Sequence, residues 1–139
     1  MNIVVLEGYV NNPGDLSWDA LKRYGNVTVY DRTPREKLAA RVVDADVAVS
    51  SKIAWDAEAL AWAPHLKMIA LTSTGFNVVD LDAARERDIV VSNVPAYSTP
   101  DVAQMTFALL LELCLHVGKH SSLVMDGAWT RAKDFSFWD

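Results

Sequence analysis

A six-residue segment in the middle of the chain has the residue types of a binding loop for a small anion. It reads Thr72-Ser73-Thr74-Gly75-Phe76-Asn77 and follows a short apolar run. Its backbone N–H groups can cradle a carboxylate, and its glycine permits close approach of the backbone to a ligand. Lys52, which follows an earlier apolar run, can add a positive charge. Together they predict a site for a small carboxylate.

Both features also have a purely structural interpretation. Turns between a strand and a helix are polar by default, so Thr72–Asn77 can be no more than such a turn. A lone lysine such as Lys52 is more often a solvated surface residue. The residue types alone leave the two interpretations open.

The remaining chemistry-bearing residues predict neither a metal site nor a catalytic histidine. His65, His116 and His120 show no metal-ligand spacing, and we interpret them as structural. Cys114 is the single cysteine and lies in an apolar run, which favours the role of a small buried hydrophobe. A chain without a possible internal disulfide fits a reducing cytoplasm, and this is the location we expect.

Composition and charge narrow the class of protein. Hydrophobic residues make up 51% and charged residues 22% of the chain, as in a globular domain with a real core. The net charge of −5 gives no electrostatic footprint for nucleic acid or an anionic membrane. The N-terminal residues MNIVVLEGYV lack a basic segment and a long apolar segment, so they predict a first strand rather than a signal peptide.

Apolar runs and helical patterns alternate regularly along the chain. Continuous apolar runs are typical of strands buried on both faces of a parallel sheet. The predicted strands are Ile3–Leu6, Val27–Tyr30, Val47–Ser50, Met68–Leu71 and Ile89–Val91. The predicted helices between them are Asp15–Tyr24, Pro34–Val43, Asp56–Ala63 and Asp80–Arg87. We expect Thr33 to cap the second helix, with Pro34 at its first position and Glu36 closing a capping box.

Five strands joined by four crossover helices predict a doubly wound α/β domain. By analogy with flavodoxin-like domains, we expect the strand order 2-1-3-4-5. Ligands of such sheets bind beyond the carboxyl ends of the strands. The loops expected at that edge are Glu7–Asp15, Ser51-Lys52, Thr72–Asn77 and Asn93–Thr99.

The chain after the last predicted strand has a different character. A helix is expected from about Asp101 to His116, apolar on nearly every side. It is too short to span a membrane, which needs about 20 apolar residues, and two polar residues interrupt it. A helix that is hydrophobic all round is normally buried on all sides. One small sheet cannot do this, nor can it bury the aromatic tail of Trp129, Phe135, Phe137 and Trp138. The pattern therefore predicts a further domain or a partner chain.

Three blocks of sequence resemble the D-2-hydroxyacid dehydrogenase family, nearest to its hydroxypyruvate reductase and glycerate dehydrogenase branch. The first block runs from Leu71 to Ala84, and the second from Ile89 to Thr99 and on into Val102-Ala103-Gln104. The third comprises Leu109–Leu113 and Gly127-Ala128-Trp129. Together the blocks have the order and spacing of the family.

The resemblance implies roles for individual residues. The backbone amides of Ser73, Thr74 and Gly75 would hold the substrate carboxylate, and Lys52 would line the same site. Asn77 lies in the same block, and we expect it to bind the substrate as well.

Three further positions follow from the resemblance. Tyr97 would lie in the hinge toward a nucleotide-binding domain and contribute to the substrate site. Thr106 would approach the nicotinamide. Gln104 departs from the Val-Ala-Glu that is common in the family.

The resemblance also implies features that these residues lack. No two of the six glycines are two residues apart, so there is no G-x-G-x-x-G fingerprint. The family's catalytic arginine, acidic partner and histidine base correspond to positions beyond Asp139. We therefore expect an inactive chain without a bound cofactor, and a longer protein that uses NAD or NADP.

The expected organisation combines these inferences. Residues 1–98 would be the N-terminal part of a substrate-binding domain. Residues 99–139 would be a hinge, the first helix of a truncated nucleotide-binding domain and a dimerisation arm. The expected partners are a small 2-hydroxy or 2-oxo acid and a second copy through residues 100–139, with no nucleic acid, membrane or metal.

Three other classes of protein share the expected fold. A receiver domain needs clustered acidic residues after the first strand and an aspartate ending the third, where this chain has Glu7 alone and Ser50-Ser51. A flavin-binding flavodoxin needs its Ser/Thr-rich glycine loop after the first strand rather than the fourth. A non-catalytic domain that binds a small molecule remains open, because a fold does not fix a function.

Overall fold

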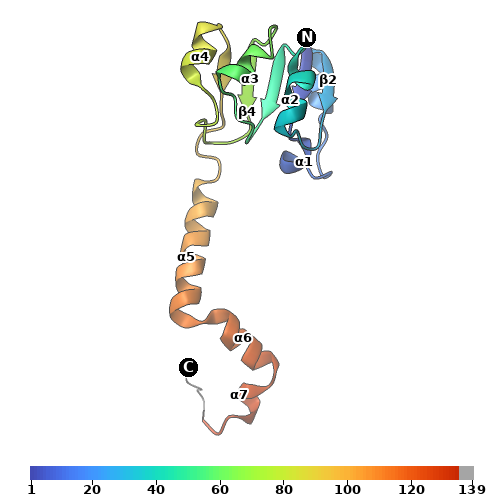
Figure 1. The fold of residues 1–139 in the computed structure, drawn as a ribbon. Coiled ribbons are helices and arrows are strands. Elements are labelled where there is room, and N and C mark those ends of the chain that lie inside the picture. The colour runs from blue at the N-terminus through green and yellow to red at the C-terminus, as the bar shows by residue number, and fades with distance from the viewer. Residues whose placement is uncertain (135–139) are drawn as a thin grey trace. The chain divides into compact units, whose positions relative to one another are not determined.

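The structure is a computed structural model in which residues 1–134 are described. The chain divides into two compact units, Met1–Ala96 and a second that begins at Tyr97 (Figure 1). The first unit contains strands β1 (Asn2–Val5), β2 (Asn26–Val29), β3 (Val47–Ser50), β4 (Met68–Leu71) and β5 (Val90–Ser92). Its helices are α1 (Gly8–Asn11), the 3-10 helix η1 (Asp19–Tyr24), α2 (Arg35–Val42), α3 (Ala57–Ala61) and α4 (Leu81–Glu86).

The five strands form one parallel sheet in the order β2-β1-β3-β4-β5, which confirms the predicted fold class and strand order. Ile3 pairs with Val27 of β2 on one side and with Val47 of β3 on the other. From β1 the chain adds β2 on one side of the sheet, and it then adds β3, β4 and β5 on the other side. The direction in which strands are added therefore changes between β1 and β3. The carboxyl ends of these strands are therefore the topological switch point at which such sheets bind ligands.

Alternation along β1 divides the core between the two faces of the sheet. Val4 and Leu6 belong to the larger cluster, which includes Leu38 of α2, Leu60 of α3 and the fully buried Trp55. Ile3 and Val5 belong to a smaller cluster on the opposite face, against Trp18 and Leu21. The central strands are buried by helices on one face and by the η1 segment on the other.

The two edge strands are not buried as predicted. Val90 of β5 is 60% exposed and Val29 of β2 is 39% exposed. The expectation of five strands buried on both faces is wrong for these two. They lie at the edges of the sheet, beyond the area that the packed helices cover.

The first crossover also differs from the prediction of a helix over Asp15–Tyr24. The chain forms the short α1 directly after β1 and then a turn, and only Asp19–Tyr24 is helical. The side-chain oxygen of Asn12 accepts hydrogen bonds from the backbone N–H groups of Gly14 and Leu16, at 3.1 and 2.9 Å. This local hydrogen bonding favours a turn over a helix.

Thr33 does not cap α2, so the predicted capping box is wrong. Pro34 occupies the N-cap position, and no side chain caps the helix. The Thr33 hydroxyl instead donates to the carbonyl oxygen of Leu6 at 2.6 Å and accepts from the Arg41 guanidinium at 2.6 Å. A buried carbonyl beyond the end of a strand needs a donor, and this tertiary contact takes precedence over the cap.

The second unit contains α5 (Thr99–Leu115), α6 (Val117–Met125) and α7 (Ala128–Arg131). Pro100 lies in the first turn of α5, and His116 separates α5 from α6 with a left-handed backbone (φ 45°). Among residues 1–134, no single helix is long and apolar enough to cross a membrane; α5 and α6 reach the required length only together, with a bend of 65° between them.

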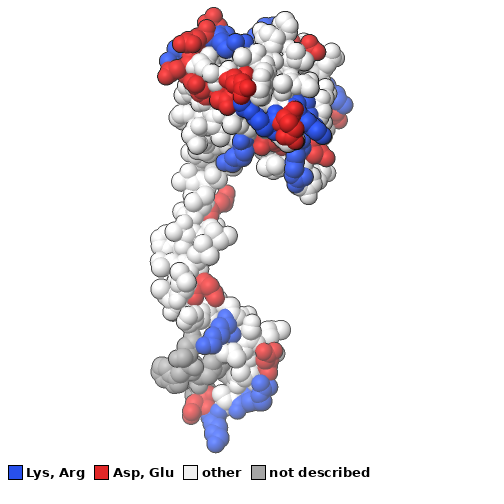
Figure 2. Space-filling model, in the orientation of Figure 1, with Lys and Arg blue, Asp and Glu red and all other residues white. Residues whose placement is uncertain are grey.

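No residue of α5 is buried; the sequence predicted that this chain alone cannot cover so apolar a helix. Leu113 is 76% exposed and Phe107 is 64% exposed. Cys114 is exposed as well, so its predicted burial is not observed in this chain. Figure 2 shows the α5 stretch almost without charged side chains, in contrast to the first unit. The predicted tail residues Phe135, Phe137 and Trp138 lie outside the described residues.

Candidate functional site

The loops that follow β1, β3, β4 and β5 are joined by hydrogen bonds at the carboxyl edge of the sheet. Oε2 of Glu7, after β1, accepts from the backbone N–H groups of Ser51 and Lys52, after β3, at 2.6 and 2.8 Å. The Thr72 hydroxyl, after β4, donates to Oδ1 of Asn11 at 2.8 Å. The edge therefore presents one connected set of loops.

Both ends of the Thr72–Asn77 loop are fixed by backbone hydrogen bonds. The N–H of Thr72 donates to the carbonyl oxygen of Ser50 at 2.9 Å, which extends the ladder between β4 and β3. At the other end, the N–H of Trp55 donates to the carbonyl oxygen of Val78 at 2.7 Å. Trp55 is fully buried, so it anchors the far end of the loop in the core.

The middle of this loop contains three backbone N–H groups that make no hydrogen bond within residues 1–134. They belong to Ser73, Thr74 and Gly75. The Ser73 side chain is buried and its hydroxyl donates to the carbonyl oxygen of Gly75 at 2.9 Å, whereas Thr74 and Gly75 are exposed. Consecutive unpaired N–H groups of this kind suit an anion.

The backbone conformation of Gly75 does not require a glycine. Its φ lies outside the positive range that favours glycine. A Cβ built at this position would meet only Oδ1 of Asn77, at 3.2 Å. The first atom of a side chain at this position would therefore meet little of the protein. Asn77 itself is exposed, beside Gly75.

Lys52 lies on the loop after β3, next to the Thr72–Asn77 loop. The two loops touch where the Ser73 hydroxyl approaches the carbonyl oxygen of Ser51, at 3.4 Å. The Lys52 side chain is exposed, and its ammonium group forms no hydrogen bond or ion pair with any residue from 1 to 134. A lysine on a neighbouring loop is a residue type that suits a carboxylate site.

Two predicted site residues, Tyr97 and Thr106, belong to the second unit, which is described here by itself. Tyr97 is 59% exposed at the start of that unit. The Thr106 hydroxyl donates to the carbonyl oxygen of Val102, one turn earlier in α5, at 2.8 Å. Their roles in binding substrate and nicotinamide remain predictions.

The sequence placed the Glu7–Asp15 loop at this edge but assigned no role in the site to Glu7 or Asn11. Glu7 is only 8% exposed, and its backbone oxygen accepts from the Asn11 side-chain amide at 3.1 Å. The one available signal was the position of Glu7, an acidic residue directly after a fully apolar strand. Such a residue lies at the carboxyl edge of the sheet.

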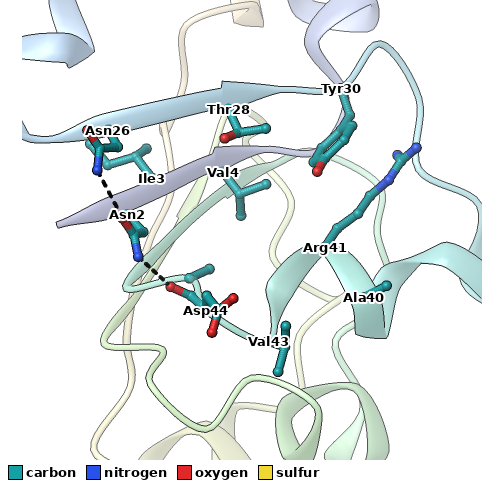
Figure 3. Close-up of a pocket in the computed structure, with 11 residues that line it drawn as sticks. Asn2, Ile3, Val4, Asn26, Thr28, Tyr30, Ala40, Arg41, Val43 and Asp44 are labelled. Carbon is teal, nitrogen blue, oxygen red and sulfur yellow. Dashed lines mark hydrogen bonds between the residues drawn. The ribbon is translucent and has the colours of Figure 1, made fainter.

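A hollow lies between α2 and the strands β1 and β2 (Figure 3). The cation that it offers, Arg41, stacks on the Tyr30 ring at 3.9 Å and donates to the carbonyl oxygen of Arg32 at 2.8 Å. Arg41 is thus occupied by internal contacts. Across residues 1–134, no group of three potential metal ligands occurs either. The carboxyl edge is the candidate site.

Comparison with known proteins identifies the family of this chain. Residues 3–132 match the model of the D-isomer specific 2-hydroxyacid dehydrogenase catalytic domain. The chain belongs to this family. The family resemblance inferred from the sequence blocks is thereby confirmed.

A curated relative and two solved structures show the extent of the match. Hydroxypyruvate reductase from Blautia hydrogenotrophica is 43% identical over 142 residues, which cover 100% of this chain and 44% of the relative. A protein from Thermus thermophilus has a TM-score of 0.74 at 31% identity, covering 100% of this chain and 43% of that one. NAD-dependent formate dehydrogenase from Staphylococcus aureus, in complex with NAD, has a TM-score of 0.70 at 26% identity, covering 91% of this chain and 42% of that one.

The coverages show that this chain corresponds to only part of each relative. It spans less than half the length of each of these relatives. The match nevertheless includes both the loops of the carboxyl edge and helix α5.

Proposed function

We propose that this chain supplies the carboxylate-binding part of an NAD(P)-dependent oxidoreductase acting on small 2-oxo and 2-hydroxy acids of the hydroxypyruvate, glyoxylate or D-glycerate type. The observation that carries the proposal is the row of unpaired N–H groups at Ser73, Thr74 and Gly75 beside the exposed Lys52. Membership of the family and the hydroxypyruvate reductase relative support the substrate class.

The role of these residues is to bind and orient the acid. Hydrogen bonds from the loop to the two carboxylate oxygens would fix the plane of that group, and C2 is bonded directly to it. Positioning of this kind supplies a large part of the catalysis of such reactions. When bound, the nicotinamide would supply the hydride that C2 accepts or donates.

The cofactor would be held outside the described part of this chain. Dinucleotides bind to a glycine-rich turn at a helix N-terminus, and the sequence has no such motif. Thr106 of α5 is the residue of this chain that we propose to approach the nicotinamide, so Thr106→Ala should alter cofactor geometry more than substrate affinity. We propose that residues 1–98 bind the substrate and that residues 99–139 contact the nucleotide.

Two further properties belong to the proposal. The exposed apolar surface of α5 supports a homodimer through residues 100–139. The single cysteine, which excludes an internal disulfide, supports a cytoplasmic location.

Steady-state assays of a longer protein that contains this chain test the proposal. Hydroxypyruvate, glyoxylate and other small 2-oxo acids should be turned over with NADH or NADPH. Absence of turnover with all of them would refute it and would favour a domain that binds a small molecule without catalysis. Calorimetric titration of the 139-residue chain with NADH should give no heat of binding; micromolar affinity would show that the cofactor site is assigned wrongly.

A further inference from the structure

The loop after β1 holds both loops that form the proposed carboxylate site. The Glu7 side chain binds the loop after β3 through the N–H groups of Ser51 and Lys52. The Glu7 carbonyl binds Asn11, which in turn accepts from the hydroxyl of Thr72 after β4. Glu7 and Asn11 together thus connect the loop that carries Lys52 to the Thr72–Asn77 loop.

From this arrangement we propose that Glu7 is a positioning residue of the carboxylate site, acting through the backbone of Ser51 and Lys52. This inference rests on the proposed function. Glu7 is only 8% exposed, and its contacts at 2.6 and 2.8 Å are charge-assisted hydrogen bonds. Two adjacent N–H groups that converge on one oxygen fix the orientation of the peptide that carries Lys52.

The fixed peptide has a consequence for binding. A lysine side chain has high rotamer freedom, so its ammonium group is positioned only as well as the backbone from which it extends. Within residues 1–134, the Glu7 carboxylate bonds to backbone N–H groups and neutralises no ammonium group. The charge of Lys52 therefore stays available to a substrate carboxylate while its backbone is held.

The test uses the longer protein that contains this chain and three substitutions at Glu7. Glu7→Ala removes both hydrogen bonds, and we expect KM for the 2-oxo acid to rise about tenfold or more, with kcat changed much less. Glu7→Gln keeps an oxygen acceptor without the charge and should give a smaller rise. Glu7→Asp keeps the charge on a shorter side chain and should fall between the wild-type protein and Glu7→Ala.

Asp46 offers a matched control at the opposite edge of the sheet. Its Oδ2 accepts from the backbone N–H of Asn2 at 2.8 Å, so it also joins the segments of β1 and β3 through a carboxylate and an amide. Asp46→Ala should lower the melting temperature and leave KM unchanged. If it raises KM as much as Glu7→Ala does, the effect of Glu7 is one of general stability and the inference is wrong.

A double-mutant cycle separates action through Lys52 from an independent effect. If Glu7 acts by positioning Lys52, the effects of Glu7→Ala and Lys52→Met on KM should be clearly less than multiplicative. Fully multiplicative effects would overturn the inference. Should Glu7→Ala fail to fold, the cycle with Glu7→Gln gives the same decision.

The failure of this inference can be told from failure of the proposed function. A wild-type protein that turns over no 2-oxo acid contradicts the proposed function. A wild-type protein that does, with a raised KM in Lys52→Met and an unchanged KM in Glu7→Ala and Glu7→Gln, contradicts only the role of Glu7.

Discussion

The side-chain amide of Asn93 donates a hydrogen bond of 2.7 Å to the carbonyl oxygen of Thr74. Two further bonds join the same loops, from the Thr74 hydroxyl to the carbonyl oxygen of Val94 at 3.1 Å and from the N–H of Val94 to the carbonyl oxygen of Ser73 at 3.1 Å. The loop after β5 therefore braces the loop of unpaired amides from the side opposite to Glu7.

Asn93→Ala should loosen this brace. A neutral hydrogen bond contributes about 1 kcal/mol, so we expect KM for the 2-oxo acid to rise by roughly a factor of five. Asn26→Ala is the control, because Asn26 bonds to Asn2 at the opposite edge of the sheet, at 3.4 Å. Steady-state kinetics should show a change in KM for Asn93→Ala only; equal changes in both variants would mean that the brace is irrelevant to binding.

Gly75→Val should block the approach of a carboxylate while leaving the fold intact. Among residues 1–134, only Oδ1 of Asn77 lies within 4 Å of a Cβ at Gly75, so we expect the fold to tolerate the substitution. KM should rise about tenfold or more if one charge-assisted hydrogen bond is lost. The melting temperature should stay close to that of the wild-type protein.

Gly25→Ala is the informative contrast to Gly75→Val. A Cβ at Gly25 would overlap the backbone of Met1, so this substitution should lower the melting temperature without a specific effect on KM. An unchanged KM in Gly75→Val would show that the loop is only a turn.

Acid should weaken the link between α2 and α3 through Asp56. The backbone N–H of Ala59 and the Arg35 guanidinium, at 2.8 and 2.9 Å, lower the pKa of Asp56 below its ordinary value of 3.8. A carboxyl whose pKa is lowered on folding stabilises the protein above its unfolded pKa, and this contribution is lost as the pH falls through the folded pKa. The contribution of Asp56 is therefore present at about pH 7 and lost below about pH 4.

Denaturation of the wild-type protein and Asp56→Ala at several pH values measures this contribution. The wild-type protein should be more stable at neutral pH, and the difference in the free energy of unfolding should shrink below about pH 4. A difference that is constant from about pH 7 to about pH 3 would contradict the assignment of the carboxylate as the charged partner.

The 139-residue chain should form a dimer or a larger species in solution. Leu109, Leu111 and Leu113 are 58%, 49% and 76% exposed, and burial of one leucine side chain contributes roughly 1.5–3 kcal/mol. Light scattering at micromolar concentration should therefore report more than a monomer. A chain ending near Ser98, which lacks α5, is the control and should shift toward monomer; a sharp monomer of the full 139-residue chain would disprove the prediction.

The sequence by itself determined the sheet, and it supplied the hypothesis for where the site lies. Short apolar runs between helical patterns predicted all five strands, and their number and alternation limited the fold to a doubly wound sheet. The polar Thr72–Asn77 segment was identified from its residue types, because a glycine among hydroxyl side chains is a local feature. The predicted helix over Asp15–Tyr24 was wrong in its first part, because the hydrogen bonds that Asn12 accepts favour a turn there.

Only the tertiary structure decided how the loops of the site are held. Glu7 and Ser51 are 44 residues apart in sequence, and Asn11 and Thr72 are 61 apart. Such residues meet because β1 lies beside β3 and β3 lies beside β4. The register of these strand pairs determines which loop residues lie side by side at the carboxyl edge. The prediction for Thr33 was wrong for the same reason. Its hydroxyl donates to the carbonyl oxygen of Leu6, a contact that forms only when β1 lies in its place in the sheet. Side-chain hydrogen bonds between distant segments depend on strand order and register, and no short-range pattern encodes them.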